Sequence, residues 1–337
     1  MLRETADSAS QFRNATAIQD SKTKSESAKI DGCFLCRAGL EVALDDLTDT
    51  RFGTPGSYQV YRCANCGLEQ TYPVPSLPEL KRLYEAQYNF GGETGTLYTR
   101  LRERFFFSFL NRAWMWLDGD ISFYQVRGRG RLLDIGCNEG RGLRIYARNG
   151  FEVEGLELNE RAAALAREGG FCVQTRLVGE FDPTDPYNVV VLSNVLEHSL
   201  DPRQMLLDVR QIVAAGGSLW ISCPNSRSWL RKALGRFWIN WHVPFHIFHF
   251  SPDTLAKLLA ETGYTEIRVC QITPALWVAQ SLIAYFFAER GKKNRQLRNP
   301  VLTVCFMLLA RCVFFPVLWL GNRLGHGDCL IATATKA

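Results

Sequence analysis

Residues 131–140 read RLLDIGCNEG, an apolar run that ends in a turn with two glycines, and the following GLRIYARNG has helical character. The order predicts a buried strand, a loop and a helix that ends at Gly150. Gly136 and Gly140 let the backbone approach a ligand closely, and the helix N-terminus behind them offers free N–H groups. Asp134 precedes the turn, where it can orient the loop or accept a hydrogen bond from a ligand ammonium group. The stretch predicts an α/β fold with a ligand at this turn.

The next unit, FEVEGLELNERAAALAREGG (151–170), predicts a second strand that ends at Glu157 and a helix capped by Asn159. Glu157 lies about twenty residues beyond the loop, where a carboxylate can accept hydrogen bonds from both hydroxyls of a ribose. An adenosine-containing ligand is therefore expected. Because the loop reads D-x-G-x-x-x-G and lacks G-x-G-x-x-G, a nicotinamide-dependent oxidoreductase is the less favoured alternative.

Residues 188–196 (NVVVLSNVL) predict a fourth strand, and polar side chains follow where ligands bind in open α/β sheets. These side chains are those of Ser193, Asn194, Glu197 and His198. The next helix is expected to begin after the cap Asp201 and to end at Gly216, before another strand. This completes an αβ repeat next to the first turn.

Two C-x-x-C pairs precede the predicted sheet. Cys33 and Cys36 lie in DGCFLC, and Cys63 and Cys66 lie in YRCANCG. Each pair lets two thiolates reach one ion from a tight turn, and four thiolates complete the tetrahedron of a structural zinc site. Residues 31–75 are therefore predicted to form a small zinc-binding module that depends on its metal, and unrelated thiols or a redox pair are the alternative.

Four segments in this order resemble one family: LLDIGCNEG (132–140), VLEHSLDP (195–202), AAGGSLWISCPN (214–225) and PFHIFHFSPDTL (244–255). Together with the cysteine pairs ahead of them, they look like class I S-adenosylmethionine-dependent methyltransferases of the branch that often carries a paired-cysteine, zinc-ribbon-like module. The resemblance covers residues 31–274 and the last strand. It implies a doubly wound, Rossmann-like, seven-stranded sheet, with a methyltransferase domain over 131–274.

The same resemblance implies S-adenosyl-L-methionine as the cofactor. Its methionine part would lie against Asp134, Gly136, Cys137 and Gly140, its ribose would be held by Glu157, and Asn194 is expected to contribute at the end of the fourth strand. The family usually has Gly where this chain has Asn138, and Asn tolerates left-handed backbone angles better than most residues.

A basic and aromatic segment, WLRKALGRFWINW (229–241), leads to three histidines and is interpreted as a lid over the acceptor. A histidine of near-neutral pKa can remove the proton of an acceptor hydroxyl as the methyl group moves. His246 is the first candidate for this base, followed by His249 and His198. An ordinary hydrogen-bonded role is the alternative for each, because positioning of the reactants alone can supply much of the acceleration. A carboxylate of quinone-biosynthesis methyltransferases is replaced here by Asn194, which argues against an acceptor-bound metal.

Residues 275–325 form a hydrophobic insertion before the last strand at 326–337. It contains ALWVAQSLIAYFFA (275–288), a basic turn, and VLTVCFMLLARCVFFPVLWL (301–320). The first run is too short to span a bilayer, and the second is interrupted by Arg311 and Pro316. Because the last two strands are sheet neighbours in this fold, the insertion must leave and return on one side of a membrane.

A hairpin embedded in a membrane surface is therefore expected, and a hairpin packed on the domain or on a second subunit is the alternative. Anionic head groups and the interface would be met by Lys292, Lys293, Arg295, Arg298, Trp277 and Trp319. The acceptor would then be lipid-linked or poorly soluble. O-methylation of a lipid-linked or glycan acceptor is the leading function, and a non-catalytic zinc-binding membrane scaffold is a second alternative.

The composition suits a globular protein, with 47% hydrophobic and 22% charged residues. The net charge of +5 without a basic block predicts no nucleic-acid partner and favours an anionic membrane surface. Residues 1–30 predict a disordered tail, and 76–130 a helical connector with a helix over 77–88 and an amphipathic one near Leu101, Phe105 and Phe109. Eleven cysteines, four of them paired, favour a cytoplasmic location, peripheral on the inner face of a membrane. Nothing indicates an oligomeric state.

Overall fold

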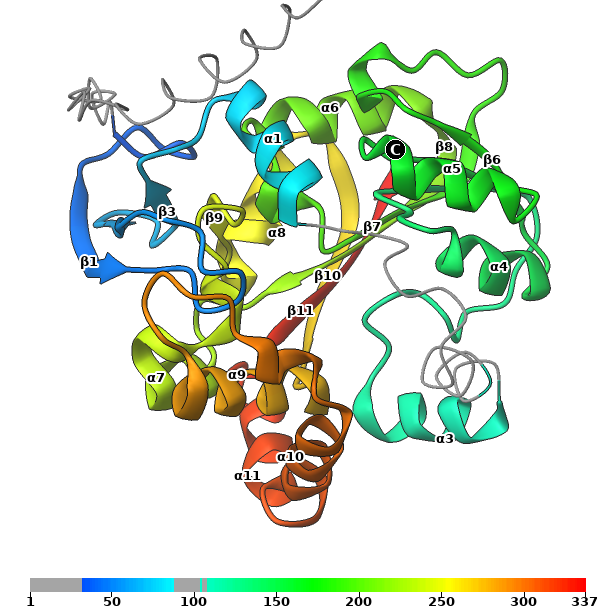
Figure 1. Cartoon of the computed structure of the whole chain (residues 1–337). Helices are drawn as coiled ribbons and strands as arrows, with labels where there is room; N and C mark the ends of the chain where they lie inside the picture. Colours follow the sequence, from blue (N-terminus) through cyan, green and yellow to red (C-terminus); the bar gives the residue numbers. More distant parts are fainter. Residues whose placement is uncertain (1–31, 88–103, 105–107) are drawn as a thin grey trace, which may run out of the picture. The chain divides into compact units, whose positions relative to one another are not determined.

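A seven-stranded mixed sheet forms the centre of the computed structural model, which describes residues 32–87, 104 and 108–337 (Figure 1). Its order is β10-β11-β8-β7-β4-β5-β6. The strands are β4 (Arg131–Ile135), β5 (Glu152–Leu156), β6 (Cys172–Gln174), β7 (Tyr187–Ser193), β8 (Val213–Pro224), β10 (Tyr264–Ile272) and β11 (Cys329–Lys336). The run from β8 to β6 is parallel, whereas β11 is antiparallel to both of its neighbours. The predicted doubly wound α/β class is confirmed.

Helices cover both faces of this sheet (Figure 1). Leu132 packs with α4 (Arg141–Arg148) and α5 (Glu160–Glu168), while its neighbour Leu133 packs with α6 (Pro202–Ile212) and α8 (Pro252–Glu261). Successive strand residues point to opposite faces, so a strand buried on both sides is apolar at nearly every position. This explains the continuous apolar runs of the sequence.

The helix starts follow the expected caps. Asn159 accepts a hydrogen bond from the backbone N–H of Ala162, and Asp201 accepts one from that of Gln204. The predicted end of the second of these helices at Gly216 is wrong, because α6 ends at Ile212 and β8 begins directly at Val213. Val213 already pairs with Tyr187 of β7, so sheet pairing ends the helix before the glycines are reached.

The paired-cysteine segment forms a second, antiparallel sheet. Its order is β1 (Leu40–Leu47), β2 (Tyr58–Cys63), β3 (Glu69–Tyr72) and β9 (Phe248–His249). The last strand comes from the histidine-rich segment nearly two hundred residues later. Leu35 and Leu68 belong to the same hydrophobic core as the residues of α6 and α8. The module and the part that contains the seven-stranded sheet are thus joined through shared strands and a shared core.

The connector is described in part. Helix α1 (Leu77–Gln87) matches the expected short helix, and α3 (Phe109–Asp118) covers the end of the expected amphipathic one. Leu101 and Phe105, like the expected tail at 1–30, lie outside the described residues.

The hydrophobic insertion divides into a buried helix and two exposed ones. Helix α9 (Ala275–Phe287) buries most of its length against the protein, including Trp277 and Ile283, and its Ser281 hydroxyl accepts a hydrogen bond from the Ile239 N–H. The expectation that Trp277 lies at a membrane interface is wrong, because this part of α9 packs beneath the segment 229–241, whereas Tyr285 and Phe286 at the end of the helix are exposed. Helices α10 (Pro300–Cys312) and α11 (Phe315–Arg323) instead leave large apolar side chains exposed.

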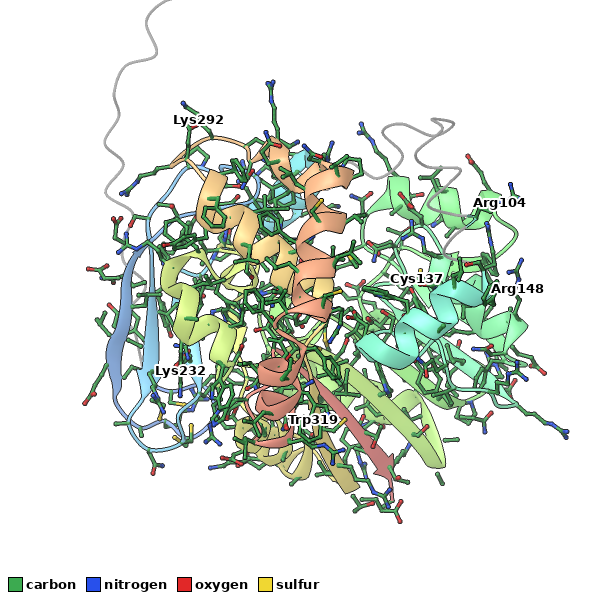
Figure 2. The ribbon with its side chains drawn as sticks, turned by 90° about the horizontal axis from the view of Figure 1, so that it is seen from below. Arg104, Cys137, Arg148, Lys232, Lys292 and Trp319 are labelled. Carbon is green, nitrogen blue, oxygen red and sulfur yellow. The ribbon has the colours of Figure 1, made fainter. Side chains whose placement is uncertain are left out.

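An ion pair fastens α10 to the domain. The Arg311 guanidinium, 6% exposed, contacts the Asp118 carboxylate at the end of α3, with Nε 2.7 Å from Oδ1, and also donates to the Thr273 carbonyl at 2.7 Å. The charge that interrupts the second apolar run therefore points into the protein. Figure 2 shows Lys292 and Trp319 at opposite ends of the hairpin.

Among the described residues, no single helix is both long and apolar enough to cross a membrane. Taken together, α10 and α11 meet the length and composition criteria, but they are bent by 68° at their junction.

Replacing Asp118 by Ala is expected to lower the free energy of unfolding by about 3 kcal/mol, because the buried Arg311 guanidinium loses its counter-charge. Removing both charges, as in D118L/R311M, should recover most of that loss. Urea denaturation of the two variants beside the wild type measures the difference. Equal stability of Asp118→Ala and wild type would show that the pair does not hold the hairpin.

Candidate functional site

The turn after β4 has the conformation that its glycines suggest. Gly136 and Gly140 have φ of +76° and +75°, and Asn138 between them has φ of +49°. A Cβ at Gly136 would lie 2.7 Å from Val195 Cγ2, and one at Gly140 would lie 2.9 Å from the Cβ of Ala166. Both positions thus require the absence of a side chain, and Asn138 adopts the left-handed conformation that was expected of it.

Glu157 connects this turn to the end of β5. Its Oε2 accepts the Asn138 N–H at 3.0 Å, and its Oε1 accepts the Asn159 N–H at 2.7 Å. Burial raises the pKa of Glu157, and these backbone donors oppose the shift. A carboxylate held in this way keeps lone pairs for two further donors, such as the hydroxyls of a ribose.

Asp134 lies beneath the turn, at the N-terminal end of α4. Its side chain is buried, and a Cβ at Gly142 would come within 2.8 Å of its Oδ2, so the helix start can lie against the carboxyl group only because residue 142 is glycine. Burial and the negative charge of Glu157 raise the pKa of Asp134 to about 8. A cationic ligand group would relieve both effects.

Cys137 lies within the turn after β4, and Asn194 lies beside it. The Cys137 side chain is buried against Gly155, where a Cβ would meet its Sγ at 2.5 Å, so Cys137 offers backbone atoms to a ligand. Asn194 follows β7 with φ of +54°, and its N–H donates to the Ser222 carbonyl at 2.9 Å. Because Val195 touches Gly136, the Asn194 backbone lies beside the turn.

Two of the three candidate bases come together with Glu197. His198 and His246 have ring centroids 4.5 Å apart at 88°, and the His246 Nε2 lies 4.0 Å from Glu197 Oε1. Burial is the largest cause that lowers the histidine pKa values, to about 4 for His198 and well below the usual range for His246. Both imidazoles are neutral at pH 7 and can accept a proton, though more weakly than an exposed histidine.

His249 is separate from this pair. It lies in β9 opposite Glu69 of β3, and its Nε2 is 2.8 Å from the Thr71 hydroxyl. Burial lowers its pKa to about 3. These contacts favour a role in joining the two sheets over a role as a base.

Sequence reasoning did not identify Tyr84, whose hydroxyl lies 2.7 Å from His198 Nδ1. Tyr84 lies in α1, 114 positions before its partner, and no local motif marks it. Sequence reasoning also missed the buried Asp328. Its carboxylate accepts hydrogen bonds from Trp238 Nε1 at 2.7 Å and from Asn240 Nδ2 at 3.1 Å. Burial raises the pKa of Asp328 to about 6. These bonds hold the segment 229–241 against the start of β11.

The four predicted metal ligands converge. Cys33 Sγ lies 3.5 Å from Cys66 Sγ, Cys36 Sγ lies 3.4 Å from Cys63 Sγ, and all four sulfurs are within 4.8 Å of one another. A zinc ion with Zn–S bonds of about 2.3 Å holds its sulfurs about 3.8 Å apart, so the set fits such an ion with small shifts. The pKa of Cys36 is lowered to about 6, mainly by hydrogen bonds from the Ala38 backbone and the Cys63 thiol that outweigh its slight burial.

Comparison with known proteins gives a family and several distant relatives. The model of a methyltransferase domain matches residues 98–269, just over half of the chain. A ubiquinone biosynthesis O-methyltransferase of Cronobacter sakazakii is 31% identical over 124 residues, covering 34% of this chain and 51% of its own. An S-adenosylmethionine-dependent methyltransferase of Mycobacterium tuberculosis is 27% identical over 143 residues, covering 41% of this chain and 50% of its own. The chain thus spans about half the length of these curated relatives.

Solved structures of methyltransferases align with this chain at low identity. A methyltransferase of Archaeoglobus fulgidus covers 72% of this chain and all of its own, with 22% identity and a TM-score of 0.41. A phosphoethanolamine N-methyltransferase of Haemonchus contortus covers 80% of this chain and 62% of its own, with 16% identity and a TM-score of 0.47.

The turn after β4, with its positive-φ glycines, and the acidic residue after β5 lie within the matched residues. The chain belongs to the methyltransferase domain family.

Proposed function

We propose that this protein methylates an oxygen atom of a lipid-linked, glycan or other poorly soluble acceptor at the cytoplasmic surface of a membrane. The observation that best supports the cofactor part is the Glu157 carboxylate, bonded to the turn that contains Gly136 and Gly140. The match to a methyltransferase family lends no support to the alternatives of a scaffold with a degenerate pocket or of a nicotinamide-dependent oxidoreductase.

The chain's own residues fit S-adenosyl-L-methionine, which supplies a methyl group on a sulfonium sulfur when it is bound. The Glu157 oxygens would accept the ribose hydroxyls. Asp134 would neutralise the amino group of the methionine part, and the glycines of the turn allow the backbone to approach it. Asn194 and Cys137 would contribute backbone atoms at the edges of the pocket.

An oxygen acceptor is favoured by the neutral histidines near the carboxyl end of β7 and by the O-methyltransferases among the relatives. As the acceptor oxygen bonds to the methyl carbon, its proton would pass to His246 Nε2, since the Nδ1 of this ring lies 2.7 Å from the Asn240 carbonyl. S-adenosyl-L-methionine would supply the methyl group, and its sulfonium sulfur would keep the electrons of the broken C–S bond, so that charge is balanced. His198 would hold the neighbouring position, with its ring fixed by Tyr84.

The membrane part of the proposal is supported by the exposed apolar surface of α10 and α11. The exposed side chains are those of Val301, Val304, Leu308, Val313, Phe314, Val317, Trp319, Leu320 and Leu324. Val301 is 68% and Trp319 is 49% exposed. Large exposed apolar side chains gathered on two adjacent helices mark contact with a membrane or a partner, and Arg311 of α10 points into the protein rather than toward solvent.

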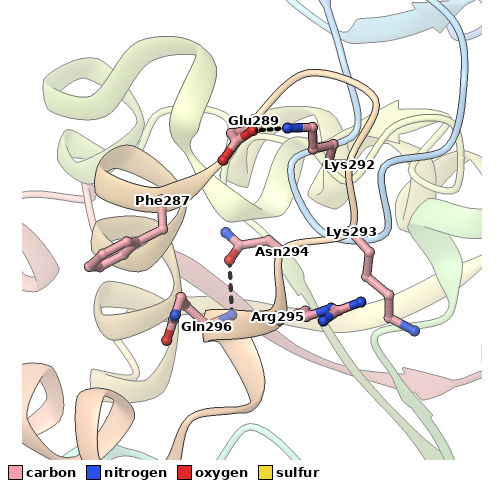
Figure 3. A pocket seen from close by; sticks show the side chains of 7 residues that line it. All are labelled: Phe287, Glu289, Lys292, Lys293, Asn294, Arg295 and Gln296. Atoms are coloured by element: carbon pink, nitrogen blue, oxygen red, sulfur yellow. Dashed lines mark hydrogen bonds and ion pairs between the residues drawn. The ribbon is translucent and has the colours of Figure 1, made fainter.

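Basic side chains lie in the loop between α9 and α10, before the start of α10 (Figure 3). Lys292 is paired with Glu289, while Lys293 and Arg295 extend away from Phe287. Each lysine or arginine near an anionic bilayer contributes about 1 kcal/mol of attraction. The loop would thus meet lipid head groups while α10 and α11 enter the acyl boundary.

We further propose that the four cysteines hold a structural zinc ion. The sulfur positions support this, since they form a compact set near the junction with the shared core. Zinc there would fix the first turns of the module and, through β3 and β9, the segment that bears His246.

Replacing Glu157 by Ala should weaken binding of S-adenosyl-L-methionine by about 1 to 3 kcal/mol, because hydrogen bonds to a charged group are lost. Calorimetry gives the dissociation constant, and Glu160→Ala, which changes an exposed carboxylate one turn away, is the matched control. With a methyl-labelled cofactor and a membrane lipid extract, the wild type should transfer label to the organic phase and Glu157→Ala should transfer less. An unaltered dissociation constant would disprove the ribose assignment.

Cofactor binding should release a proton at pH 7. Asp134 is mostly protonated in the free protein, since its pKa is about 8, and a bound ammonium group favours its carboxylate. The bound form holds fewer protons, so affinity should rise with pH up to about 8 and then level off. Calorimetry in two buffers of different ionisation enthalpy measures the release. Adenosine, which lacks the α-ammonium group of the methionine part, should release none, and Asp134→Asn should abolish the effect.

Vesicle flotation tests the membrane surface. The wild type should float with anionic phospholipid vesicles and less with neutral ones, and L308E/V317E should remain in the soluble fraction, because buried carboxylates are costly in the acyl region. Leu207→Glu, at an exposed leucine of α6, is the control and should float. The alternative outcome is that the wild type is a dimer that does not float with vesicles and that L308E/V317E is a monomer. In that case α10 and α11 are covered by a second copy of the chain.

A further inference from the structure

A cavity of about 520 Å³ lies in the loop between α9 and α10 (Figure 3). Its lining contains the cations Lys292, Lys293 and Arg295, the carboxylate of Glu289 and the ring of Phe287. Positive charge thus exceeds negative charge around a concave site, and such a site concentrates anions.

The loop that forms this cavity is held by the cysteine module. The Asn294 N–H donates to the Arg51 carbonyl at 3.1 Å, and the Arg290 guanidinium donates two hydrogen bonds to the Asp46 carboxylate, at 2.8 and 2.9 Å. Gly53 lies so close that a Cβ there would come within 2.3 Å of the loop backbone. The lining is therefore positioned before a ligand arrives, which lowers the ordering cost of binding.

The Asn294 side chain offers an unused donor. The residue is 6% exposed, and its Oδ1 accepts the Gln296 N–H at 3.2 Å, which fixes the orientation of the amide. Its Nδ2 finds no acceptor among the residues that the structure describes. Figure 3 shows this nitrogen turned away from Gln296, toward the space between Phe287 and Glu289. Because a buried N–H group without an acceptor is costly, a ligand oxygen at this place would be bound favourably.

The three cations differ in how they are paired. Lys292 forms an ion pair with Glu289, whereas Lys293 and Arg295 form none within the described part of the chain. The side chains of both are exposed and long, so their charged ends can turn toward an anion beside the Asn294 amide. Arginine matches two oxygens of one anion with its planar fork, and lysine adds a point charge. One amide donor with two unpaired cations suits an anion that has several oxygens.

We propose that this cavity binds the phosphate group of a phosphate ester. Phosphate has enough oxygens to accept from the Asn294 amide, Lys293 and Arg295 at once. No other residue need be displaced, since Glu289 already neutralises Lys292.

An apolar surface continues from one side of the cavity. Phe287 is 42%, Phe286 is 60% and Tyr285 is 50% exposed, and the Phe286 ring stacks on Phe306 of α10 with centroids 6.1 Å apart. A phospholipid could therefore place its phosphate in the cavity and its acyl chains along α10. The lipid as source of the phosphate rests on the membrane part of the proposed function, whereas a soluble phosphate ester would meet the same donors.

Calorimetry of the purified full-length protein with glycerol phosphate and with dihexanoyl phosphatidic acid tests the site. Asn294→Asp keeps the oxygen that accepts the Gln296 N–H but replaces the donor by an acceptor, so affinity should fall about tenfold to a hundredfold. Glu289→Gln removes the carboxylate and frees Lys292, so affinity should rise. Tighter binding of the phosphatidic acid identifies a lipid head group as the source, and equal affinities identify a soluble ester.

A second variant does not depend on a buried position. K293Q/R295Q changes two exposed side chains and should bind both compounds more weakly, whereas K257Q/R268Q, which removes two exposed cations elsewhere, should bind as the wild type does. Binding of neither compound at millimolar concentration would overturn the proposal. Unchanged affinity in both Asn294→Asp and K293Q/R295Q would overturn it as well.

The variant L308E/V317E separates this inference from the membrane proposal. Both substitutions lie outside the cavity, so the variant should bind glycerol phosphate as the wild type does even when it no longer floats with vesicles. A wild type that floats but binds neither phosphate compound would refute the cavity and leave the membrane surface standing. A wild type that binds glycerol phosphate but does not float would support the cavity and refute the membrane surface.

Discussion

The Glu157 carboxylate, shared between the loops that follow β4 and β5, is the interaction on which the site depends. The loops must leave the ends of adjacent parallel strands and still face each other across a ligand. Backbone N–H groups from both loops converge on the one carboxylate, so the free amides of Asn138 and Asn159 are satisfied before any ligand arrives. The two loops are thereby held together without a ligand, and under the proposed function the ribose hydroxyls would meet a carboxylate that is already oriented.

The segment 229–241 and the histidines after it are held differently, by contacts with parts of the chain that are distant in the sequence. The segment 229–241 is fixed to β11 by Asp328, rests on α9 through Ser281, and is anchored to the cysteine module by Arg231, which lies 3.0 Å from the buried Glu69. Arg231 also lies over the Trp241 ring, 4.7 Å from its centroid. The histidines that follow are therefore positioned by the last strand, the insertion and the N-terminal module together.

Much of this could be predicted from the sequence because its signals are local. Each strand, turn and helix unit is indicated by signals only a few residues apart. These signals are glycines that need positive φ, helix caps such as Asn159, and the apolar runs between them. The end of α6 could not be predicted, since Val213 leaves the helix to pair with β7. The burial of α9 could not be predicted either, because an apolar helix has the same composition whether it contacts lipid or protein. Tyr84 and His249 find their partners over more than a hundred positions, which no motif encodes.

The pairing of β9 with β3 has a consequence for how this chain can be divided. A fragment that begins near β4 would retain every residue of the cofactor turn, yet it would expose the hydrogen-bonding edge at Phe248 and leave His249 without Thr71. Such an edge, next to a core that includes Phe245 and Phe250, invites pairing between molecules. The boundary suggested by the cysteine pairs is therefore a poor place to cut, because a fragment that begins after residue 75 would lack β3, the strand that pairs with β9.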